Sequence, residues 1–210
     1  MPKIVGDLVF CDYLSSEEAP LTFPKGNDFM CRKCKRYGCC EIYGVGKPNP
    51  LAKSYCERFE ISELYHITRW KNIRSILKYG LLCNYLVKHR RIRRVEIGDP
   101  EIKERRSIRR IGDHSVSDYV PLFLSAKQPM LYWIKCQHPS HYNEIVYICI
   151  DSSILGSEGV YFSDGNVASH NTKIYSRLED LEALNWDLVR SRWWGFESEP
   201  KRVKAAEVLV

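Results

Sequence analysis

The residues best suited to bind a charged ligand lie between positions 101 and 132, where a dense arginine cluster runs into an apolar segment. Arg105 and Arg106 follow a predicted turn at 98–100, and their planar, permanently charged guanidinium groups suit phosphate. Residues 119–125 have the pattern of a buried strand. One interpretation is a phosphate-bearing ligand held against a core sheet. The other is a solvated basic helix beside an ordinary strand.

Glu207 and His66 are two further candidates for a site. Glu207 lies in the apolar segment 205–210, and a carboxylate there belongs at the mouth or on the polar face of a strand, because burying it unpaired is costly. An outward-facing glutamate on an amphipathic terminal strand is the alternative. His66, in the sequence YHIT, is either a ligand or a histidine satisfied within the structure. Neither residue decides the function alone.

Cysteines predict a separate metal-binding unit near the start of the chain. Six of the nine cysteines precede residue 57, and their spacing includes a CxxC pair with distant partners. Four thiolates are enough for a tetrahedral zinc site, and an iron–sulfur cluster is the rival interpretation. Free thiols are disfavoured, because this segment has too few apolar residues to fold unaided. The candidate ligands are Cys31, Cys34, Cys39, Cys40 and Cys56. Cys83, Cys136 and Cys149 are expected in the core.

The positive charge of the chain is local. The formal net charge is +6, and residues 88–110 alone carry ten Lys and Arg against four Asp and Glu. Such a patch fits a polyanion partner, with a solvated charged linker as the alternative. The sequence has no apolar run long enough to span a bilayer and no signal peptide at its start, so we expect a cytoplasmic protein without a membrane partner.

The predicted elements indicate an α+β domain beginning near residue 61. Before it, residues 1–60 are rich in Cys, Gly, Pro and Lys and form the predicted metal-binding module. After it, strands and helices mix without regular βα alternation, and neither a P-loop nor a GxGxxG motif occurs. We expect strands at 65–67, 119–125 and 144–151, and helices at 70–79, 129–137 and 177–191.

Short motifs from residue 65 to the end of the chain occur in a definite order: YHIT at 65–68, KERR at 103–106, DYVP at 118–121, PMLY at 129–132, FSDG at 162–165 and AEVLV at 206–210. In order and spacing they resemble the DarT toxins, a family of DNA ADP-ribosyltransferases. The resemblance covers about residues 60–210. It implies an α+β fold with an ADP-ribosyltransferase-like split β-sheet core and flanking helices.

The same resemblance implies the reaction and its partners. NAD would be the substrate, and ADP-ribose would pass to a base of single-stranded DNA, with thymine as the expected base. The chain would be the toxin of a toxin–antitoxin pair, and its antitoxin a macrodomain hydrolase.

By resemblance, Glu207 and Arg106 take the catalytic roles. Cleavage of the nicotinamide–ribose bond develops positive charge on the sugar, which a fixed carboxylate stabilises. Glu207 would supply that carboxylate, and Arg106 would hold the NAD phosphates or poise the target base. The other residues expected to bind NAD are Tyr65, His66, Thr68, Met130 and Tyr132.

DNA contacts are expected from basic and from aromatic residues. Guanidinium groups neutralise phosphates, and exposed rings stack on unpaired bases. In this fold the loop before the catalytic glutamate, here residues 163–204, usually selects the acceptor. For the aromatic pair Trp193 and Trp194, the alternative to DNA binding is that both side chains pack into the core. The candidates are Arg91, Arg93, Arg94, Arg105, Arg109, Asn166, Trp193 and Trp194.

Three residues depart from the family pattern: Ser117 and Asn166 stand where histidine is expected, and Phe123 where tyrosine is expected. The acceptor therefore stays open between thymine and the alternatives of guanine, RNA or protein. A hypothesis of another class is a metal-containing nucleic-acid-binding protein whose transferase domain, shortened after Glu207, is inactive.

Overall fold

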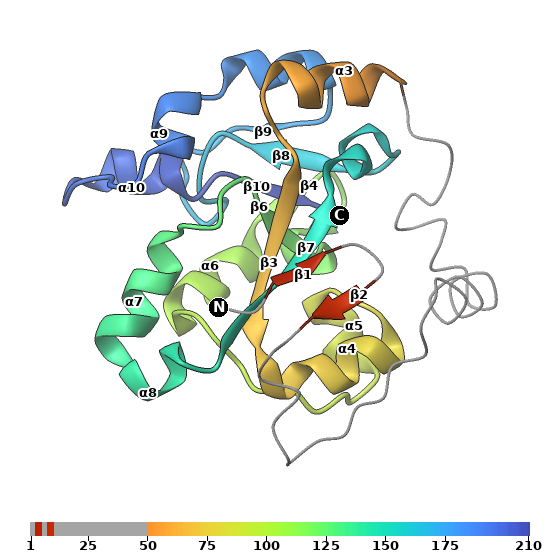
Figure 1. Cartoon of the computed structure of the whole chain (residues 1–210), viewed down its shortest axis with the longest axis vertical. Helices are drawn as coiled ribbons and strands as arrows, with labels where there is room; N and C mark the ends of the chain where they lie inside the picture. Colours follow the sequence, from red (N-terminus) through yellow and green to blue (C-terminus); the bar gives the residue numbers. More distant parts are fainter. Residues whose placement is uncertain (1–2, 6–7, 11–49) are drawn as a thin grey trace.

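The computed structural model describes residues 3–5, 8–10 and 50–210 (Figure 1). In this part of the chain, eight strands form one mixed sheet in the order β2-β1-β7-β3-β6-β10-β8-β9, and β4 and β5 form a separate hairpin. The strands are β1 (Lys3–Val5), β2 (Leu8–Phe10), β3 (Glu63–Arg69), β4 (Arg110–Ile111), β5 (His114–Ser115), β6 (Pro121–Phe123), β7 (Ile145–Asp151), β8 (Tyr161–Ser163), β9 (Ile174–Tyr175) and β10 (Glu207–Leu209).

The sheet consists of two halves that meet between β3 and β6. In one half, β3 and β7 pair antiparallel along the full length of both strands. In the other, β6, β10, β8 and β9 pair antiparallel in turn. Only the register pair Tyr65 and Phe123 joins β3 to β6. The mixed α+β class agrees with the prediction, whereas the strands of the predicted split core are joined into one sheet of eight.

Helices cover both faces of the sheet (Figure 1). Among the described residues they are α3 (Pro50–Arg58), α4 (Ile73–Tyr79), α5 (Asn84–His89), α6 (Pro100–Ile108), α7 (Pro129–Gln137), α8 (Pro139–Tyr142), α9 (Trp186–Arg190) and α10 (Ser198–Lys204), with 3-10 turns at Trp70–Asn72, Val116–Asp118, Ser152–Gly156 and Leu178–Ala183. None of these helices is long and apolar enough to cross a membrane.

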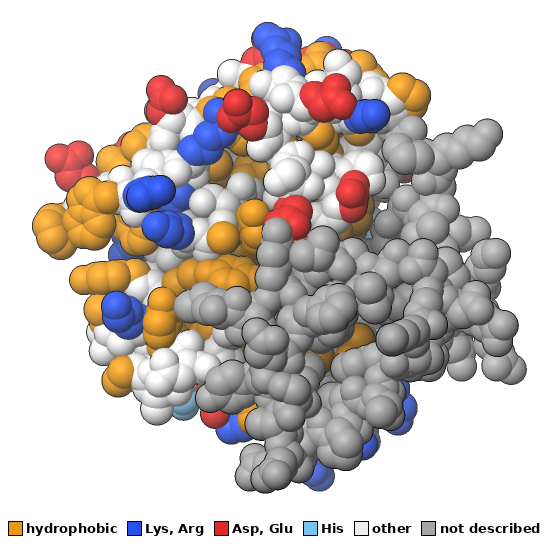
Figure 2. Space-filling model, viewed as in Figure 1, with side chains coloured by type: hydrophobic (Ala, Val, Ile, Leu, Met, Phe, Trp, Pro, Cys, Tyr) orange, Lys and Arg blue, Asp and Glu red, His pale blue; other side chains and the backbone are white. Residues whose placement is uncertain are grey.

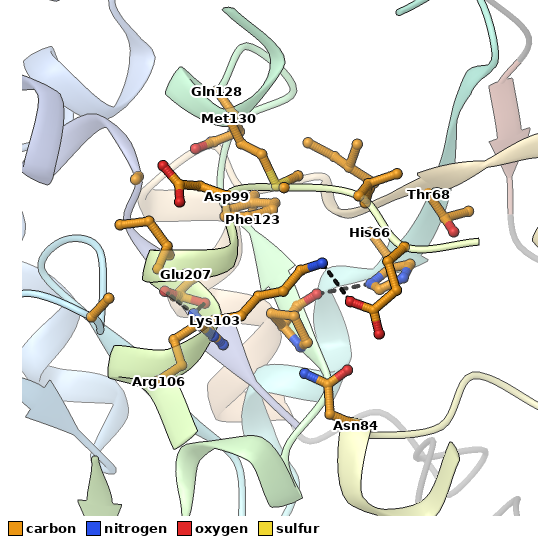
Figure 3. A pocket seen from close by; sticks show the side chains of 18 of the residues that line it. His66, Thr68, Asn84, Asp99, Lys103, Arg106, Phe123, Gln128, Met130 and Glu207 are labelled. Carbon is orange, nitrogen blue, oxygen red and sulfur yellow. Dashed lines mark hydrogen bonds and ion pairs between the residues drawn. The ribbon is translucent and has the colours of Figure 1, made fainter. Parts of the chain in front are cut away.

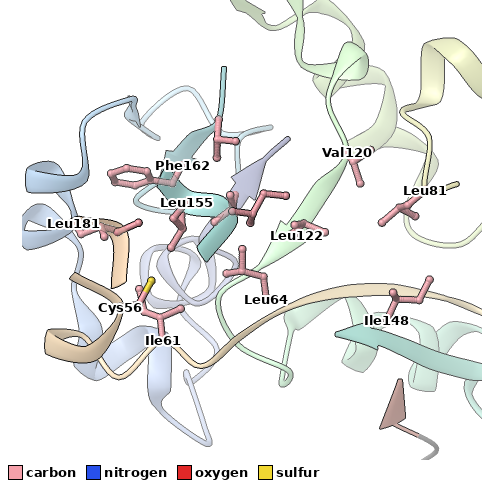
Figure 4. Close-up of a cluster of buried hydrophobic side chains, with 14 of the residues drawn as sticks. Cys56, Ile61, Leu64, Leu81, Val120, Leu122, Ile148, Leu155, Phe162 and Leu181 are labelled. Carbon is pink, nitrogen blue, oxygen red and sulfur yellow. The ribbon is translucent and has the colours of Figure 1, made fainter. Parts of the chain in front are cut away.

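Alternation along β7 explains how the sheet buries two faces. Val146 and Ile148 join the larger cluster of buried side chains (Figure 4), whereas Ile145 lies in a second cluster under α7, with Tyr147 packed against it. Successive side chains of a strand point to opposite faces, so a strand covered on both sides reads as a continuous apolar run. This is why the sequence of β7 could be recognised as a buried strand.

Several predicted elements are confirmed, and two need correction. Helix α7 spans the predicted residues 129–137, and α4 ends at Gly80, whose φ of 82° suits glycine. The helix predicted at 177–191 is wrong, because Asn185 starts a new helix there by accepting a hydrogen bond from the Leu188 amide. The strand predicted at 119–125 shortens to β6.

The described part of the first sixty residues belongs to the same body as the rest. Helix α3 packs into the larger core, where Cys56 is buried and its thiol donates to the Ser152 carbonyl at 3.5 Å. Burial raises the pKa of this thiol, which opposes the thiolate form that a metal needs. Cys56 is therefore a core residue, and its part in a metal site stays a prediction, since no other proposed ligand lies among the described residues.

The other four proposed ligands, Cys31, Cys34, Cys39 and Cys40, lie outside the described residues, and no group able to hold a metal occurs within the described ranges. Their role in binding zinc or an iron–sulfur cluster stays a prediction, as does a separate module before the transferase domain. Cys83 and Cys149 are buried as expected, but Cys136 is exposed, so its assignment to the core is wrong.

Candidate active site

A cavity of about 490 Å³ opens where the two halves of the sheet meet (Figure 3). Its walls come from β3, α4, α5, the segment 91–99, α6, β6, the start of α7, residues 166–169, α10 and β10. More cationic than anionic side chains line it, which favours an anionic ligand. The cations are Arg94, Lys103, Arg105, Arg106, Lys201 and Arg202, and the acids are Glu96, Asp99 and Glu207.

Glu207 forms the floor of the cavity and is only 1% exposed. Nη1 of Arg106 donates to both carboxylate oxygens, at 2.8 and 2.7 Å, and the amide of Val167 donates to Oε1 at 3.0 Å. We call Glu207, Arg106 and the Val167 amide the carboxylate floor. Because every one of these bonds is buried or partly buried, the carboxylate has one well-defined orientation.

The backbone of Glu207 is fixed by Ser163 on the neighbouring strand. The Glu207 amide donates to Oγ of Ser163 at 3.2 Å, and that hydroxyl donates to the Gly165 carbonyl at 2.6 Å. This side-chain link fastens β10 to the loop that follows β8.

Arg106 reaches Glu207 because α6 presents one face to the cavity. Asp99 caps this helix by accepting a hydrogen bond from the Glu101 amide at 2.8 Å, and Pro100 occupies its first turn. Ile102 and Arg106, four residues apart, both line the cavity. Arg105 turns outward to pair with Glu101 at 2.7 Å, although it also reaches the rim of the cavity.

His66 lies where backbone pairing between β3 and β6 stops. Its Nδ1 is 3.0 Å from the Pro121 carbonyl, and a carbonyl can only accept, so Nδ1 carries the hydrogen. Burial lowers the pKa of the imidazole, with the Pro121 bond acting weakly in the opposite direction. The ring is therefore neutral near pH 7, and Nε2 is left as an acceptor for a ligand hydroxyl or amide.

Asn72 attaches the segment 91–99 to the β3 side of the cavity. Its side-chain oxygen accepts from the Val95 amide at 2.7 Å, and Nδ2 donates to the Val95 carbonyl at 2.8 Å and to Thr68 Oγ1 at 3.1 Å. The side-chain amide of Asn72 thus bonds both backbone groups of Val95, as a neighbouring strand would. Asn72 positions this wall, and the sequence reasoning missed it.

An ion-pair network stiffens the same segment. Glu96 accepts from Lys103 of α6 at 2.5 Å and from Arg94 at 2.6 Å. Burial alone would raise the pKa of Glu96, but the hydrogen bonds and charges of Lys103 and Arg94 outweigh it and lower the pKa to about 2. The carboxylate therefore stays ionised at any physiological pH.

The loop after β8 forms another part of the cavity wall, through Asn166, Ala168 and Ser169. Arg109 donates to the carbonyls of Ser169 and Thr172, at 2.5 Å each, so its guanidinium supports the loop from beneath. Arg202 of α10 donates to Asp164 Oδ1 at 2.8 Å. A Cβ on Gly165 would lie 2.9 Å from the Arg202 carbonyl, so only glycine fits there.

Predicted site residues divide into two groups. The first group lines the cavity and consists of Glu207, Arg106, His66, Thr68, Met130, Arg94, Arg105 and Asn166. Outside the lining are Tyr65, Tyr132, Arg91, Arg93, Arg109, Trp193 and Trp194. Tyr65 instead meets the ring of Tyr147 edge-on at 6.1 Å.

The two tryptophans belong to a surface cluster of rings, not to the core. Trp193 stacks on Trp194 at 6.0 Å and meets Phe196 edge-on at 5.4 Å, and Trp194 meets Tyr132 at 6.5 Å. Phe196 is 90% exposed. We call these four residues the aromatic cluster. Figure 2 shows hydrophobic side chains at the left edge of the molecule, where Figure 1 has α10 and the loop before it.

The aromatic cluster adjoins the rim of the cavity. Ser198 and Lys201 of α10, directly after the cluster, line the cavity. On α7, Met130 and Trp133 line it and flank Tyr132.

Gln128 and Arg202 are further cavity residues that sequence reasoning missed. Gln128 precedes Pro129 at the start of α7, and its side chain is buried. Neither residue belongs to a recognisable motif, and their placement depends on partners distant in space. The sequence predicted only that a helix begins at Pro129, which indicates a helix boundary and not a site.

Comparison with known proteins identifies relatives over this region. A family model described as "ssDNA thymidine ADP-ribosyltransferase, DarT" matches residues 65–210. A DNA ADP-ribosyl transferase of Thermus sp. strain 2.9 is 26% identical over 159 residues, which are 72% of this chain and 75% of that protein. A DNA ADP-ribosyl transferase–DNA ADP-ribosyl glycohydrolase fusion protein of Thermosipho africanus is 29% identical over 150 residues, but the match spans only 38% of that protein.

A solved structure has the same fold. The Thermus sp. 2.9 DarT in complex with ADP-ribosylated ssDNA superposes with a TM-score of 0.64 at 25% sequence identity, covering 72% of this chain and 75% of that one.

Proposed function

Since the chain belongs to the DarT family of single-stranded DNA thymidine ADP-ribosyltransferases, we propose that it transfers ADP-ribose from NAD+ to a base of single-stranded DNA. The carboxylate floor is the observation that carries the proposal, because a buried carboxylate with a fixed orientation at the base of a cationic cavity suits a reaction that develops positive charge on a sugar.

NAD+ would lie across the junction between the two halves of the sheet. A cavity of about 490 Å³ is within the range that encloses small molecules. Nε2 of His66 would accept from a ribose hydroxyl of the adenosine half, with Thr68 beside it, as the family resemblance implies. The diphosphate would find cationic partners in the excess of Lys and Arg around the cavity.

The reaction follows from the position of Glu207. The carboxylate accepts a hydrogen bond from the ribose next to nicotinamide and stabilises the oxocarbenium character at C1′ as the C1′–N bond breaks. Nicotinamide leaves with the electron pair of that bond, and a ring nitrogen of the base forms the new bond to C1′. Arg106 holds Glu207 in place throughout, because both carboxylate oxygens are bound to its Nη1.

Thymine is the proposed acceptor base. In DNA its N1 is bonded to deoxyribose, so N3 is the ring nitrogen free to attack, and its proton is released as the new bond forms. The base must be unpaired to reach C1′ at the bottom of the cavity. Asn166, with Ala168 and Ser169, lines the side from which the base would enter.

The DNA strand would run from the cavity across the aromatic cluster. Exposed rings offer stacking faces to the neighbouring bases. Arg91 and Arg93, both exposed, would contact phosphates on the other side of the opening, beside Arg94 in the cavity wall.

We propose a partner that removes ADP-ribose from DNA. The Thermosipho africanus relative carries a DNA ADP-ribosyl glycohydrolase in the same chain. A transferase that modifies DNA is harmful unless the modification can be reversed, so a separate hydrolase of this kind, a macrodomain antitoxin, would pair with the present chain as toxin.

The test is to incubate the protein with NAD+ and short single-stranded oligonucleotides that each contain one base type, and to follow products by mass spectrometry. A mass gain of one ADP-ribosyl group on the thymine-containing strand alone is expected. Equal labelling by Glu207→Gln would overturn the mechanism. Labelling of guanine, RNA or protein instead would keep the transferase and correct the acceptor.

A further inference from the structure

Gln128 lines the cavity, and its side chain has a buried hydrogen-bond acceptor without a partner among the described residues. The residue is 1% exposed and stands at the N-terminal boundary of α7. Its Nε2 donates to the Ser125 carbonyl at 2.7 Å, but its Oε1 has no partner among the described residues. No other buried side-chain nitrogen or oxygen in the described ranges lacks one. Figure 3 shows Gln128 on the cavity wall beside Met130 and Phe123.

The orientation of this amide is determined by its neighbour. Reversing the amide would bring two oxygens, both acceptors, together at Ser125, so the nitrogen must face the Ser125 carbonyl. Ser125 is itself held, since Nζ of Lys204 donates to its hydroxyl at 2.9 Å. Oε1 is therefore a fixed acceptor, and leaving it unpaired in the absence of ligand is unfavourable.

The position of Gln128 determines which end of a bound dinucleotide lies next to its side chain. Phe123 pairs with Glu207 across β6 and β10, and Ser125 follows two residues later. The amide thus lies beyond the strand end next to the carboxylate that faces the reacting ribose. Its surroundings, Pro129, Met130 and Trp133, are apolar side chains suited to a flat ring.

Only one of the two rings that occupy this end can satisfy the acceptor. Thymine has a single N–H, at N3, and that nitrogen must point at C1′ to react. Nicotinamide carries a carboxamide whose NH2 group is free to donate. Resting on the proposed function, we propose that Gln128 is a specificity-determining residue: its Oε1 accepts a hydrogen bond from the carboxamide NH2 of the nicotinamide of NAD+.

The test compares NAD+ with 3-acetylpyridine adenine dinucleotide, in which a methyl group replaces the carboxamide NH2. Binding to the full chain is measured by calorimetry without DNA. The wild type is expected to bind NAD+ about 5- to 150-fold more tightly than the analogue, because the analogue leaves Oε1 unpaired. Gln128→Met is expected to bind the two dinucleotides with equal affinity.

Controls separate the hydrogen bond from damage to the cavity. ADP-ribose lacks nicotinamide, so wild type and Gln128→Met should bind it equally. Gln137→Met makes the same substitution at an exposed position of α7 and should keep the preference for NAD+. If Gln128→Met does not fold, Gln128→Leu, which also lacks the acceptor, takes its place, and the wild-type comparison of the two dinucleotides still tests the role.

Each outcome has a separate meaning. Equal binding of both dinucleotides by the wild type, or a preference that Gln128→Met retains, would overturn the role of Gln128. If the wild type discriminates but does not modify DNA, the proposed function fails and the role of Gln128 stands. If it binds neither NAD+ nor ADP-ribose, both fail.

Discussion

The side chains of the carboxylate floor and those of the aromatic cluster differ in where they find their partners. On the floor, Glu207 is buried and receives its hydrogen bonds from Arg106 and the Val167 amide, so the protein completes the arrangement by itself. In the aromatic cluster, Phe196 and Trp193 leave most of their ring surface in water and contact mainly each other.

This difference indicates which part is prepared before ligand binds. A buried ion pair that lost one partner would leave a charge without compensation, so the floor has to be complete in the free protein. Exposed rings gain most by covering one another or a ligand, so the aromatic cluster can exchange its contacts for bases. We therefore expect substitutions on the floor to affect catalysis and stability, and substitutions in the cluster to affect DNA binding.

Glu207→Gln is expected to have the largest effect. The substitution keeps the shape of the side chain and an acceptor for the Val167 amide, but removes the negative charge opposite C1′. Loss of a preorganised electrostatic group lowers kcat by about 10²–10³-fold. The initial rate of oligonucleotide ADP-ribosylation measures it, with Glu197→Gln, at an exposed position, as the control. A comparable loss in the control would disprove the assignment.

Arg106→Ala is expected to destabilise the fold as well as the site. It leaves the Glu207 carboxylate buried and unpaired, which costs about 3–5 kcal/mol of the free energy of unfolding. Urea denaturation measures this cost. Arg105→Ala is the matched control, because Arg105 makes an exposed ion pair with Glu101 that contributes at most about 1 kcal/mol. Equal losses for the two variants would mean that Arg106 is not coupled to a buried charge.

Much of the floor could be predicted from the sequence, and its support could not. Glu207 stood out because a carboxylate inside an apolar strand needs a reason, and Arg106 because the KERR motif resembles a known family. Asn72 had no such signal, since its role depends on Val95, which reaches it only after the chain has folded. The burial of Gln128 depends in the same way on Ser125 and the packing of α7.

The fold shows the same division between local and long-range information. Helix α7 and strand β7 follow from the pattern of their own residues, in β7 a continuous apolar run, and both were predicted. The helix predicted at 177–191 failed because four leucines at helical spacing also suit a 3-10 turn followed by a short helix. There, Trp186 donates from its indole to the Leu181 carbonyl at 2.8 Å and holds the break in place.

Trp193→Ala is expected to weaken DNA binding without affecting chemistry. Stacking on one ring contributes about 1–3 kcal/mol per base, so KM for the oligonucleotide should rise about 5- to 150-fold while KM for NAD+ stays unchanged. Steady-state kinetics with varied oligonucleotide separates the two. Tyr85→Ala is the matched control, because Tyr85 and Trp193 are both 56% exposed and Tyr85 lies outside the cluster. A change in KM for NAD+ would contradict the assignment of Trp193 to DNA binding alone.

Lys204 lies between the two regions along the chain, and the pH dependence of stability should reveal the burial of its ammonium group. It ends α10, between the aromatic cluster and Glu207, and its buried ammonium donates only to uncharged groups, at 2.9 Å to Ser125 Oγ and 2.5 Å to the Val189 carbonyl. Burial, with a smaller effect of nearby Lys127, lowers its pKa to about 8. The proton is thus bound more weakly in the folded chain than in the unfolded chain.

The sign of the effect follows from that difference. Between pH 8 and about 10.4, the ordinary lysine pKa, the unfolded chain binds the extra proton, so this contribution to stability increases as the pH rises and is lost as it falls to 8. From pH 7 to pH 10 the free energy of unfolding of the wild type should gain on the order of 2 kcal/mol relative to Lys204→Met. Urea denaturation at both pH values measures the difference.

Lys201→Met, on the exposed side of the same helix, is the control and should follow the wild type. The Cys56 thiol, whose pKa burial raises, has the opposite pH dependence but is present in all three proteins and cancels from the comparison. If Lys204→Met keeps the wild-type pH dependence, the ammonium is solvated in the folded protein. The hydrogen bonds from Lys204 to Ser125 and Val189 would then be open to water and would not hold a buried charge.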